Sequence, residues 1–326
     1  MARENRADGL ISVVAPIFNE AEIIEKFFIE VRANLLTSGF HGKFEIVLVD
    51  DGSTDSSGEK IDLLAEEYPE EVVAIHLARN FGHQAAVSAG LEYCRGDAVI
   101  LMDSDLQDDP AAFKPFVEQW LEGYDVVYAR RTKRRESFLV RPFIWLFYKL
   151  FGWMANIKIP RNSGNFSLMD RRVIDRLNEI GERNRYLPGL RTWVGFKQTG
   201  VPVARRKRYD RRNRVGFRGL WTLAMNAIFS FSYVPIFFFR AIGVIAILIS
   251  LITIIALLVL SASNAQAVSP LATTLITIAF FGGINLIGVS IVGEYVARIY
   301  DEVKGRPKYV IDRIFSARKS VPGGDE

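Results

Sequence analysis

Two aspartates one residue apart, Asp103 and Asp105, are the residues of this 326-residue chain whose type and spacing best suit catalysis. They follow the apolar run 98–102, which predicts a buried strand, and they precede Gln107. Carboxylate oxygens are the ligands that hard divalent cations prefer. At a strand end they would reach a cleft where a cation can also hold a diphosphate. Because so short a pattern also occurs in solvated loops, its weight depends on the rest of the chain.

A second acidic strand end lies upstream in the chain. The apolar run 46–49 is followed by Asp50 and Asp51, and then by Gly52 and Ser53. An aspartate before Gly-Ser commonly bonds its own backbone, so Asp50 could be only a loop cap, and Asp51 is the better candidate for binding a ligand. Two acidic strand ends in one chain favour a nucleotide site.

The first 130 residues alternate between strand and helix patterns. Strands are predicted at 11–16, 45–50, 72–78, 98–103 and 126–129, and helices at 20–36, 56–67, 83–94 and 111–121. This alternation indicates an α/β, mostly parallel sheet with helices on both faces, and a ligand beyond the carboxyl ends of its strands. The first strand is not followed by G-x-G-x-x-G, which argues against a nicotinamide or flavin dinucleotide enzyme, and no P-loop pattern occurs.

Two long apolar stretches near the C-terminus predict two transmembrane helices. Between 234 and 260 only Arg240 is charged, and between 271 and 293 no residue is, so each exceeds the roughly 20 residues that span a bilayer. A pair of buried core helices is the alternative. Lys and Arg are absent from the loop 261–270 but frequent on the outer flanks, so both termini and the N-terminal region are predicted to be cytoplasmic. No signal peptide is visible, and we expect the single cysteine, Cys94, to pack in a helix.

Two stretches between the predicted sheet and the first apolar stretch, at 130–148 and 205–223, each begin with basic residues and continue into aromatic and aliphatic ones. Such segments are typical of juxtamembrane helices in the membrane interface, and for most of their basic residues general attraction to anionic lipid is the favoured explanation. With a formal net charge of only +4, nucleic acid is not an expected partner. The predicted regions are an α/β core at 1–136, a region with the juxtamembrane helices at 137–233, two transmembrane helices at 234–297 and a cytoplasmic tail at 298–326.

Taken in order, four motifs resemble the inverting family 2 glycosyltransferases of GT-A, Rossmann-like fold. The segments are Ser12–Glu20, Val49–Asp55, Arg79–Gly82 and Met102–Gln107. The stretch Gly293–Glu302 with Gly305-Arg306-Pro307 is similar to the polyprenyl-phosphate branch of that family, especially the bactoprenol glucosyltransferases. The resemblance covers roughly residues 11 to 311 and implies transfer of a hexose, with glucose from UDP-glucose as the leading expectation, to polyprenyl phosphate.

The resemblance also implies roles for named residues. Asp51 would bond the uracil or ribose, and the nucleotide sugar would contact Pro16, Phe18, Glu20, Asp51, Asn80 and Asp103. Mg²⁺ or Mn²⁺ would be held by Asp103, Asp105 and Gln107, and the catalytic residues would be Asp103, Asp105 and Arg130. The acceptor phosphate, already anionic, would be bound by Arg208, Arg211 and Arg214. A homo-oligomer, four protomers in relatives, and a bacterial plasma membrane location complete the expectation.

The chain departs from this family in two places. Asn162, Asn165 and Ser167 stand where many members have carboxylates and an arginine, and 211–214 reads Arg-Arg-Asn-Arg in place of Gly-x-Ser-Lys. These departures leave open a different donor, such as mannose or an amino sugar, and a catalytically weakened membrane scaffold or lipid-linked sugar flippase. A processive polysaccharide synthase should show Gln-x-x-Arg-Trp and more spans, and neither is found.

His83 has a plain structural explanation beside a functional one. His83, at a predicted helix start, could approach the nucleotide, but histidine there more often packs or begins the helix. His41 and His76 have no such context. Glu294 and Arg298, four apart, are expected to pair on one helix face.

Overall fold

The structure of the chain is a computed structural model that describes residues 8–131, 163–182, 185–204, 206, 234–262 and 270–316. Its described residues form two compact units, a sheet unit that includes residues 307–316 and a helix pair between 234 and 306. Each unit is described by itself below.

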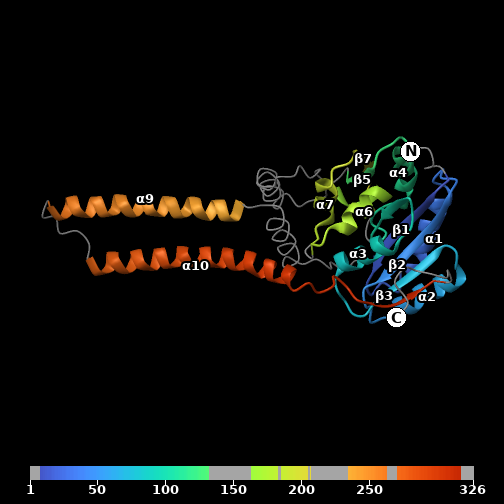
Figure 1. Cartoon of the computed structure of the whole chain (residues 1–326), viewed down its shortest axis with the longest axis horizontal. Helices are drawn as coiled ribbons and strands as arrows, with labels where there is room; N and C mark the ends of the chain where they lie inside the picture. The colour runs from blue at the N-terminus through green and yellow to red at the C-terminus, as the bar shows by residue number, and fades with distance from the viewer. Residues whose placement is uncertain are drawn as a thin grey trace. The chain divides into compact units, whose positions relative to one another are not determined.

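The sheet unit is built on eight described strands (Figure 1). They are β1 (Leu10–Ile17), β2 (Lys43–Asp50), β3 (Val72–Leu77), β4 (Ala98–Leu101), β5 (Val126–Arg131), β6 (Ser163–Asp170), β7 (Gln198–Val203) and β8 (Ile311–Phe315), in the spatial order β7-β5-β6-β4-β1-β2-β3-β8. The pairs β1–β2, β2–β3, β1–β4 and β5–β7 are parallel, whereas β6 and β8 run antiparallel to their neighbours. The carboxyl ends of β1 and β4 are adjacent, where the direction of strand order reverses. Ligands of open α/β sheets bind at such a point.

Helices cover both faces of the sheet (Figure 1). They are α1 (Ile24–Leu36), α2 (Ser57–Glu67), α3 (His83–Tyr93), the 3-10 turn η1 (Pro110–Ala112), α4 (Phe113–Leu121), α6 (Arg171–Glu179) and α7 (Leu187–Trp193). Residue Val13 of β1 shares its core cluster with apolar residues of α1, α2 and α4. Its neighbour Val14 faces α3, where a Cβ added to Gly90 would collide with the valine side chain. Because successive side chains of a strand point to opposite faces, each face of the sheet is covered by one layer of helices. Gly90 permits the close approach of α3.

The predicted order of strands β1 to β5 and of their helices is present. The fourth strand ends at Leu101, two residues earlier than predicted, because its pairing with β6 stops at Leu101↔Ser167. The strands β6, β7 and β8 were not predicted, and they draw residues 163–203 and 311–315 into the sheet. The expected boundary at residue 136 therefore does not coincide with the end of the sheet.

The second unit is a pair of long helices, α9 (Val234–Ala262) and α10 (Pro270–Val303), that lie side by side (Figure 1). They pack closely at Gly288, where an added Cβ would collide with the ring of Phe239. Among the described residues, one segment, Phe280–Val303, is long and apolar enough to cross a membrane, and α9 contributes a shorter apolar stretch, Ala241–Ser250. Two spanning helices therefore stay a prediction. The expected pairing in α10 is confirmed, since Arg298 Nε donates to Glu294 Oε1 at 2.9 Å.

Candidate active site

The carboxyl ends of β1 and β4 are joined by Ser104, the central residue of the Asp-Ser-Asp motif. Its buried hydroxyl lies 2.9 Å from the carbonyl oxygen of Pro16 and also contacts the carboxylate of Glu20. Glu20 in turn donates its backbone N–H to Ser57 Oγ at 2.9 Å. The predicted donor-site residues Pro16 and Glu20 are therefore brought next to the motif, while Phe18 beside them is 37% exposed.

Asp51 holds the loop that leads into α3. Its Oδ1 accepts the backbone N–H of Phe81 at 2.7 Å, and its Oδ2 accepts that of Gly82 at 2.9 Å. Burial raises the pKa of Asp51 above its usual value, although these two N–H groups act in the opposite direction. The carboxylate is thus fixed at the end of β2, beside the exposed Asn80, where a nucleotide is expected.

Asp50 closes the turn that carries Asp51, in agreement with the loop-cap expectation. Its Oδ1 accepts the backbone N–H of Ser53 at 3.0 Å. Gly52, at φ +65°, lies against the backbone of Arg79 and Asn80, so closely that an added Cβ would collide with it. Only glycine fits this place, because it combines a left-handed backbone with a contact that leaves no space for a side chain.

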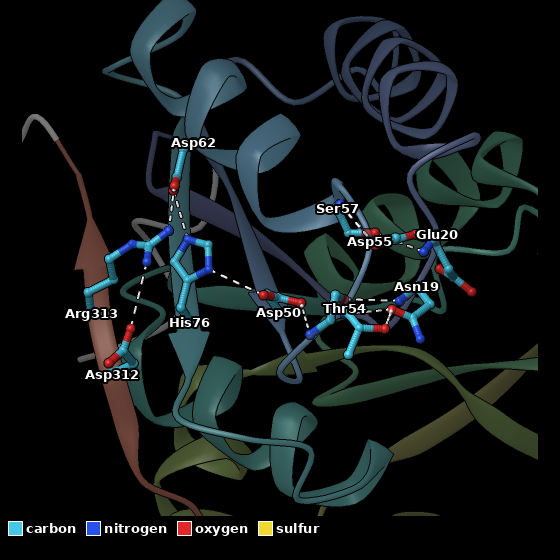
Figure 2. A network of polar contacts seen from close by, with 11 residues as sticks. Asn19, Glu20, Asp50, Thr54, Asp55, Ser57, Asp62, His76, Asp312 and Arg313 are labelled. Atoms are coloured by element: carbon cyan, nitrogen blue, oxygen red, sulfur yellow. Dashed lines mark hydrogen bonds and ion pairs between the residues drawn. The ribbon is translucent and has the colours of Figure 1, made fainter.

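Asn19 links the β1 end to the same turn (Figure 2). Its backbone N–H donates to Ser53 Oγ at 3.0 Å, and its side-chain Oδ1 accepts the N–H of Thr54 at 2.8 Å. Asn19 has a φ of +52°, a conformation that asparagine tolerates better than most residues. The loops after β1 and β2 are therefore held together as one surface.

Asp103 and Asp105 each have a defined local partner. His83 Nε2 lies 2.9 Å from Asp103 Oδ1, and Asp105 Oδ1 accepts the backbone N–H of Gln107 at 3.1 Å. Desolvation lowers the pKa of His83, but its hydrogen bond and charge attraction to Asp103 outweigh this, and the pKa is raised. His83 therefore contacts the Asp-Ser-Asp motif directly, which favours a functional role over simple helix packing.

Of the basic residues expected near the site, the structure describes Arg130 and Arg206. Arg130 is exposed near the carboxyl end of β5, and this end lies on the same side of the sheet as the carboxyl end of β4. Arg206, from the basic run 205–218, donates its backbone N–H to the carbonyl of Gln107 at 2.8 Å and pairs with Glu30 and Asp109. The expected acceptor residues Arg208, Arg211 and Arg214 lie outside the described residues.

Sequence reasoning missed His76, which is buried between two carboxylates. Its Nδ1 lies 3.3 Å from Asp50 Oδ2 and its Nε2 lies 2.7 Å from Asp62 Oδ1 (Figure 2). The signal was the position of His76 at the end of the third predicted strand, level with the acidic end of the second. Cys94 is buried at the end of α3, as expected.

The donor set fits a divalent cation of the kind that binds with a diphosphate. Within the described part of the chain there is no group of three or more His, Cys, Asp or Glu side chains that could hold a metal. Mg²⁺ is ordinarily held by one or two carboxylates together with water and substrate phosphates, and Asp103 and Asp105 supply that number. Both carboxylates belong to one short loop beside the switch point.

A sheet with acidic loops at its switch point is typical of enzymes that handle nucleotide-linked substrates. The family described as glycosyl transferase family 2 matches residues 12–177, and the chain belongs to this family. It is therefore a glycosyltransferase with a mostly parallel, mixed α/β sheet of GT-A type.

Three relatives are similar to the chain over nearly its whole length. A prophage bactoprenol glucosyl transferase homolog of Escherichia coli is 37% identical over 93% of this chain and 99% of its own length. The bactoprenol glucosyl transferase of Shigella phage SfII is 37% identical, over 93% and 97%. An uncharacterized glycosyltransferase of Synechocystis is also 37% identical, over 94% and 95%. Among solved structures, a mannosyltransferase of Pyrobaculum calidifontis in complex with GDP-Man and Mn²⁺ is similar at a TM-score of 0.45 and 18% identity, covering 90% of this chain and 88% of that one.

Proposed function

We propose that this glycosyltransferase transfers glucose from UDP-glucose to polyprenyl phosphate, with inversion at the anomeric carbon. The observation that carries the proposal is the identity of 37% to bactoprenol glucosyl transferases over almost their entire length. That similarity covers 93% of this chain, and so extends well beyond residues 12–177, which match the family model.

The donor nucleotide is assigned to the loops after β1, β2 and β3. Pro16, Phe18 and Glu20 would form one wall, and Asp51 and Asn80 the other. Because the Asp51 carboxylate already accepts two backbone N–H groups, it can give the uracil or ribose only its remaining lone pairs. Its main contribution would be to fix the shape of the wall.

The diphosphate is assigned to the Asp103-Ser104-Asp105 loop, with Mg²⁺ or Mn²⁺. When bound, the ion would neutralise charge on the leaving nucleoside diphosphate. Asp103, Asp105 and Gln107 would hold it through oxygen atoms, and His83 would orient Asp103. Ser104 keeps this loop against β1 and therefore against the sugar-nucleotide wall.

The acceptor phosphate needs cations more than a strong base, because a phosphate is already an anionic nucleophile at neutral pH. Arg130 lies near the carboxyl end of β5, on the same side of the sheet as the carboxyl end of β4. Arg208, Arg211 and Arg214 are proposed to bind the acceptor. Guanidinium groups suit this task since they bind phosphate in a bidentate manner. Asn165 on β6 is an amide, so this chain would work without a carboxylate base at that position.

The helix pair is proposed to anchor the enzyme in the plasma membrane, with the sheet unit and both termini in the cytoplasm. α9 and α10 would both span, and the apolar segment Phe280–Val303 supports this for α10. Assembly of several protomers, four in number, would place eight such helices together.

The proposal is tested by incubating the purified full-length protein with polyprenyl phosphate and a panel of radiolabelled nucleotide sugars, then extracting the lipid. Label in the lipid fraction from UDP-glucose alone would support the proposed reaction, and label from GDP-mannose or an amino-sugar donor would reassign the donor. A scaffold or flippase, the alternative that the amide at Asn165 favours, would bind a nucleotide sugar without labelling lipid. Asp105→Asn serves as the inactive control.

A further inference from the structure

The last described strand, β8, closes the outer edge of β3 from a distant part of the chain. The two strands pair antiparallel with His76 opposite Arg313, and Ala78 donates its backbone N–H to the carbonyl of Val310 at 2.9 Å. The approach to β8 is fixed as well, because Tyr309 bonds Glu92 of α3 and Lys308 bonds the carbonyl of Ile180. β8 is therefore a firm part of the sheet unit.

A continuous set of polar contacts runs from β8 to the turn after β2 (Figure 2). Arg313 Nη2 donates to Asp62 Oδ2 at 2.8 Å, and Asp62 Oδ1 lies 2.7 Å from His76 Nε2. His76 Nδ1 lies 3.3 Å from Asp50 Oδ2. The other Asp50 oxygen accepts the N–H of Ser53 at 3.0 Å, so the contacts end in the turn that presents Asp51.

The centre of this set is enclosed and charged. The side chains of His76 and Asp50 are only 5% and 8% exposed, and Asp62 is 22% exposed. Both ring nitrogens face a carboxylate oxygen, and only the imidazolium form can donate to both. Gly58 of α2 makes room for the pair, because an added Cβ would lie 3.3 Å from Asp50 Oδ2 and 3.5 Å from His76 Cε1.

Stability alone is a weak explanation for such a group. Buried ion pairs often contribute no more than well-packed apolar residues, since desolvation offsets their attraction. The arrangement does fix the orientation of the Asp50 carboxylate, because His76 contacts one of its oxygens and the backbone N–H of Ser53 donates to the other. A carboxylate held in this way fixes the orientation of Ser53, whose hydroxyl in turn accepts the N–H of Asn19.

We infer that His76, held as an imidazolium between Asp62 and Asp50, is a positioning residue for the nucleotide-sugar site, and that Arg313 of β8 completes its setting. The inference rests on the proposed function for the identity of the ligand, but the geometry that it concerns exists without ligand. His76 would act on donor binding through Asp50 and the turn 50–53, without touching the sugar or the diphosphate.

Protonation of His76 then controls donor affinity. Burial lowers the pKa of His76, but the hydrogen bonds to Asp50 and Asp62 outweigh burial and raise it above the ordinary value, while the nearby charge of Arg313 acts against them. The groups that face the ring are Asp50 from β2, Asp62 from α2 and Arg313 from β8. As the pH rises through this raised pKa, the ring keeps one N–H, and the shorter contact, 2.7 Å to Asp62 against 3.3 Å to Asp50, favours its staying toward Asp62. Asp50 then loses the donor from His76, and the turn loses part of its fixed orientation.

The experiment compares wild type, His76→Gln, Asp62→Asn and the control Glu66→Gln, an exposed acid on the same helix α2. One readout is hydrogen exchange of the Ser53 amide in the ligand-free, full-length protein. The other is the KM for UDP-glucose and kcat, measured from pH 6 to pH 9.

We expect faster exchange of the Ser53 amide in His76→Gln and Asp62→Asn, and no change in the control. The KM for UDP-glucose should rise about tenfold, the size expected for losing one hydrogen bond to a charged group, with kcat nearly constant. In wild type the KM should rise with pH, in Asp62→Asn this rise should move to lower pH, and in His76→Gln it should disappear. Arg313→Lys, which keeps a cation beside Asp62, should behave more like wild type than Arg313→Met.

Unchanged Ser53 exchange in His76→Gln would overturn the inference, and so would a KM profile that keeps its wild-type pH dependence in that variant. A purely structural histidine would lower the unfolding temperature without moving the profile. If the wild-type protein fails to transfer glucose, the proposed donor is wrong, but the exchange experiment still decides the role of His76.

Discussion

His83 Nε2 and Asp103 Oδ1 lie 2.9 Å apart, so the first residue of α3 orients the first carboxylate of the Asp-Ser-Asp loop. The two side chains are 44% and 37% exposed and are therefore within reach of a ligand at the sheet edge. The contact joins the loop after β3 to the loop after β4, across the strand order β4-β1-β2-β3.

Replacing His83 by Ala should lower kcat/KM for the donor by about tenfold, because Asp103 loses one charge-assisted hydrogen bond and with it a fixed orientation. Steady-state kinetics of lipid labelling measure the effect. His41→Ala, a change at an exposed histidine before β2, is the matched control and should leave the kinetics unaltered. Equal activity of both variants would remove His83 from the site.

Asp105→Asn and Asp103→Asn should each abolish metal-dependent transfer and leave the fold intact, since the changes are nearly isosteric and remove one anionic ligand. Transfer is assayed over a titration of Mg²⁺ and Mn²⁺, with circular dichroism as the folding check. Asp175→Asn on α6, where the carboxylate is 55% exposed, is the control. Retention of more than about a tenth of the rate in both variants, a loss below ~1.4 kcal/mol of barrier, contradicts the metal assignment.

Gly52→Ala should destabilise the protein more than Gly39→Ala. Both glycines have a positive φ, +65° and +82°, so both changes carry left-handed strain of about 1–3 kcal/mol. Only at position 52 would the new Cβ collide with backbone, that of Arg79 and Asn80, whereas no atom lies within 4 Å at position 39. Thermal unfolding compares the two, and the position 52 variant should also lose donor affinity. Similar unfolding temperatures would mean that the turn is free to move away.

The stability of the protein should depend on pH through His76. Hydrogen bonds to Asp50 and Asp62, stronger than the opposing effect of burial, raise its pKa in the folded state, so the folded protein binds this proton more tightly than the unfolded chain. The stabilisation is fully present below the unfolded pKa of about 6.5 and is lost as the pH rises through the raised folded pKa. Unfolding temperatures between pH 6 and pH 9 should fall in wild type and stay flatter in His76→Gln. Parallel curves would show that His76 does not titrate in this way.

The orientation of the helix pair can be tested by labelling cysteines in intact cells. Ser263→Cys, in the loop between the proposed spans, should react with an impermeant thiol reagent from outside, and Ser316→Cys after β8 should not, by the distribution of Lys and Arg. Background is expected to be low because Cys94 is buried, and burial raises its pKa to about 11. Equal labelling of the two variants would contradict a cytoplasmic sheet unit.

The sequence predicted the strands and helices up to β5, because their local hydrophobic pattern determines them. Strands such as β4 are continuous apolar runs between amphipathic helices, and the acidic residues after them follow directly in the sequence. β8 escaped prediction because five residues with two charges form a strand only when an edge such as that of β3 is available. The place of Asp51 at the sheet edge was predictable, but its hold on Phe81 and Gly82 was not, since it depends on a turn from another strand.

The contacts of His76 could not be predicted for a related reason. Its contact with Asp50 depends on the register Asp50↔His76, and its contact with Asp62 depends on how α2 lies over the sheet. No spacing within one segment contains this information. His83 was closer to prediction, because its position after Gly82 at a predicted helix start already suggested that it could approach a ligand.

The origin of β8 has a consequence for how the protein is made. A ribosome completes β1 to β4 early, but it releases residues 311–315 only after α9 and α10 have been synthesised. Until then β3 has no β8 to pair with the backbone groups of its outer edge, and Asp62 lacks its arginine. Domains begin folding during synthesis, and β8 leaves the ribosome only after both apolar helices. Pairing of β8 with β3 can therefore begin only after α9 and α10 have been synthesised, and a chain stalled before residue 311 would lack both this strand and the arginine beside Asp62.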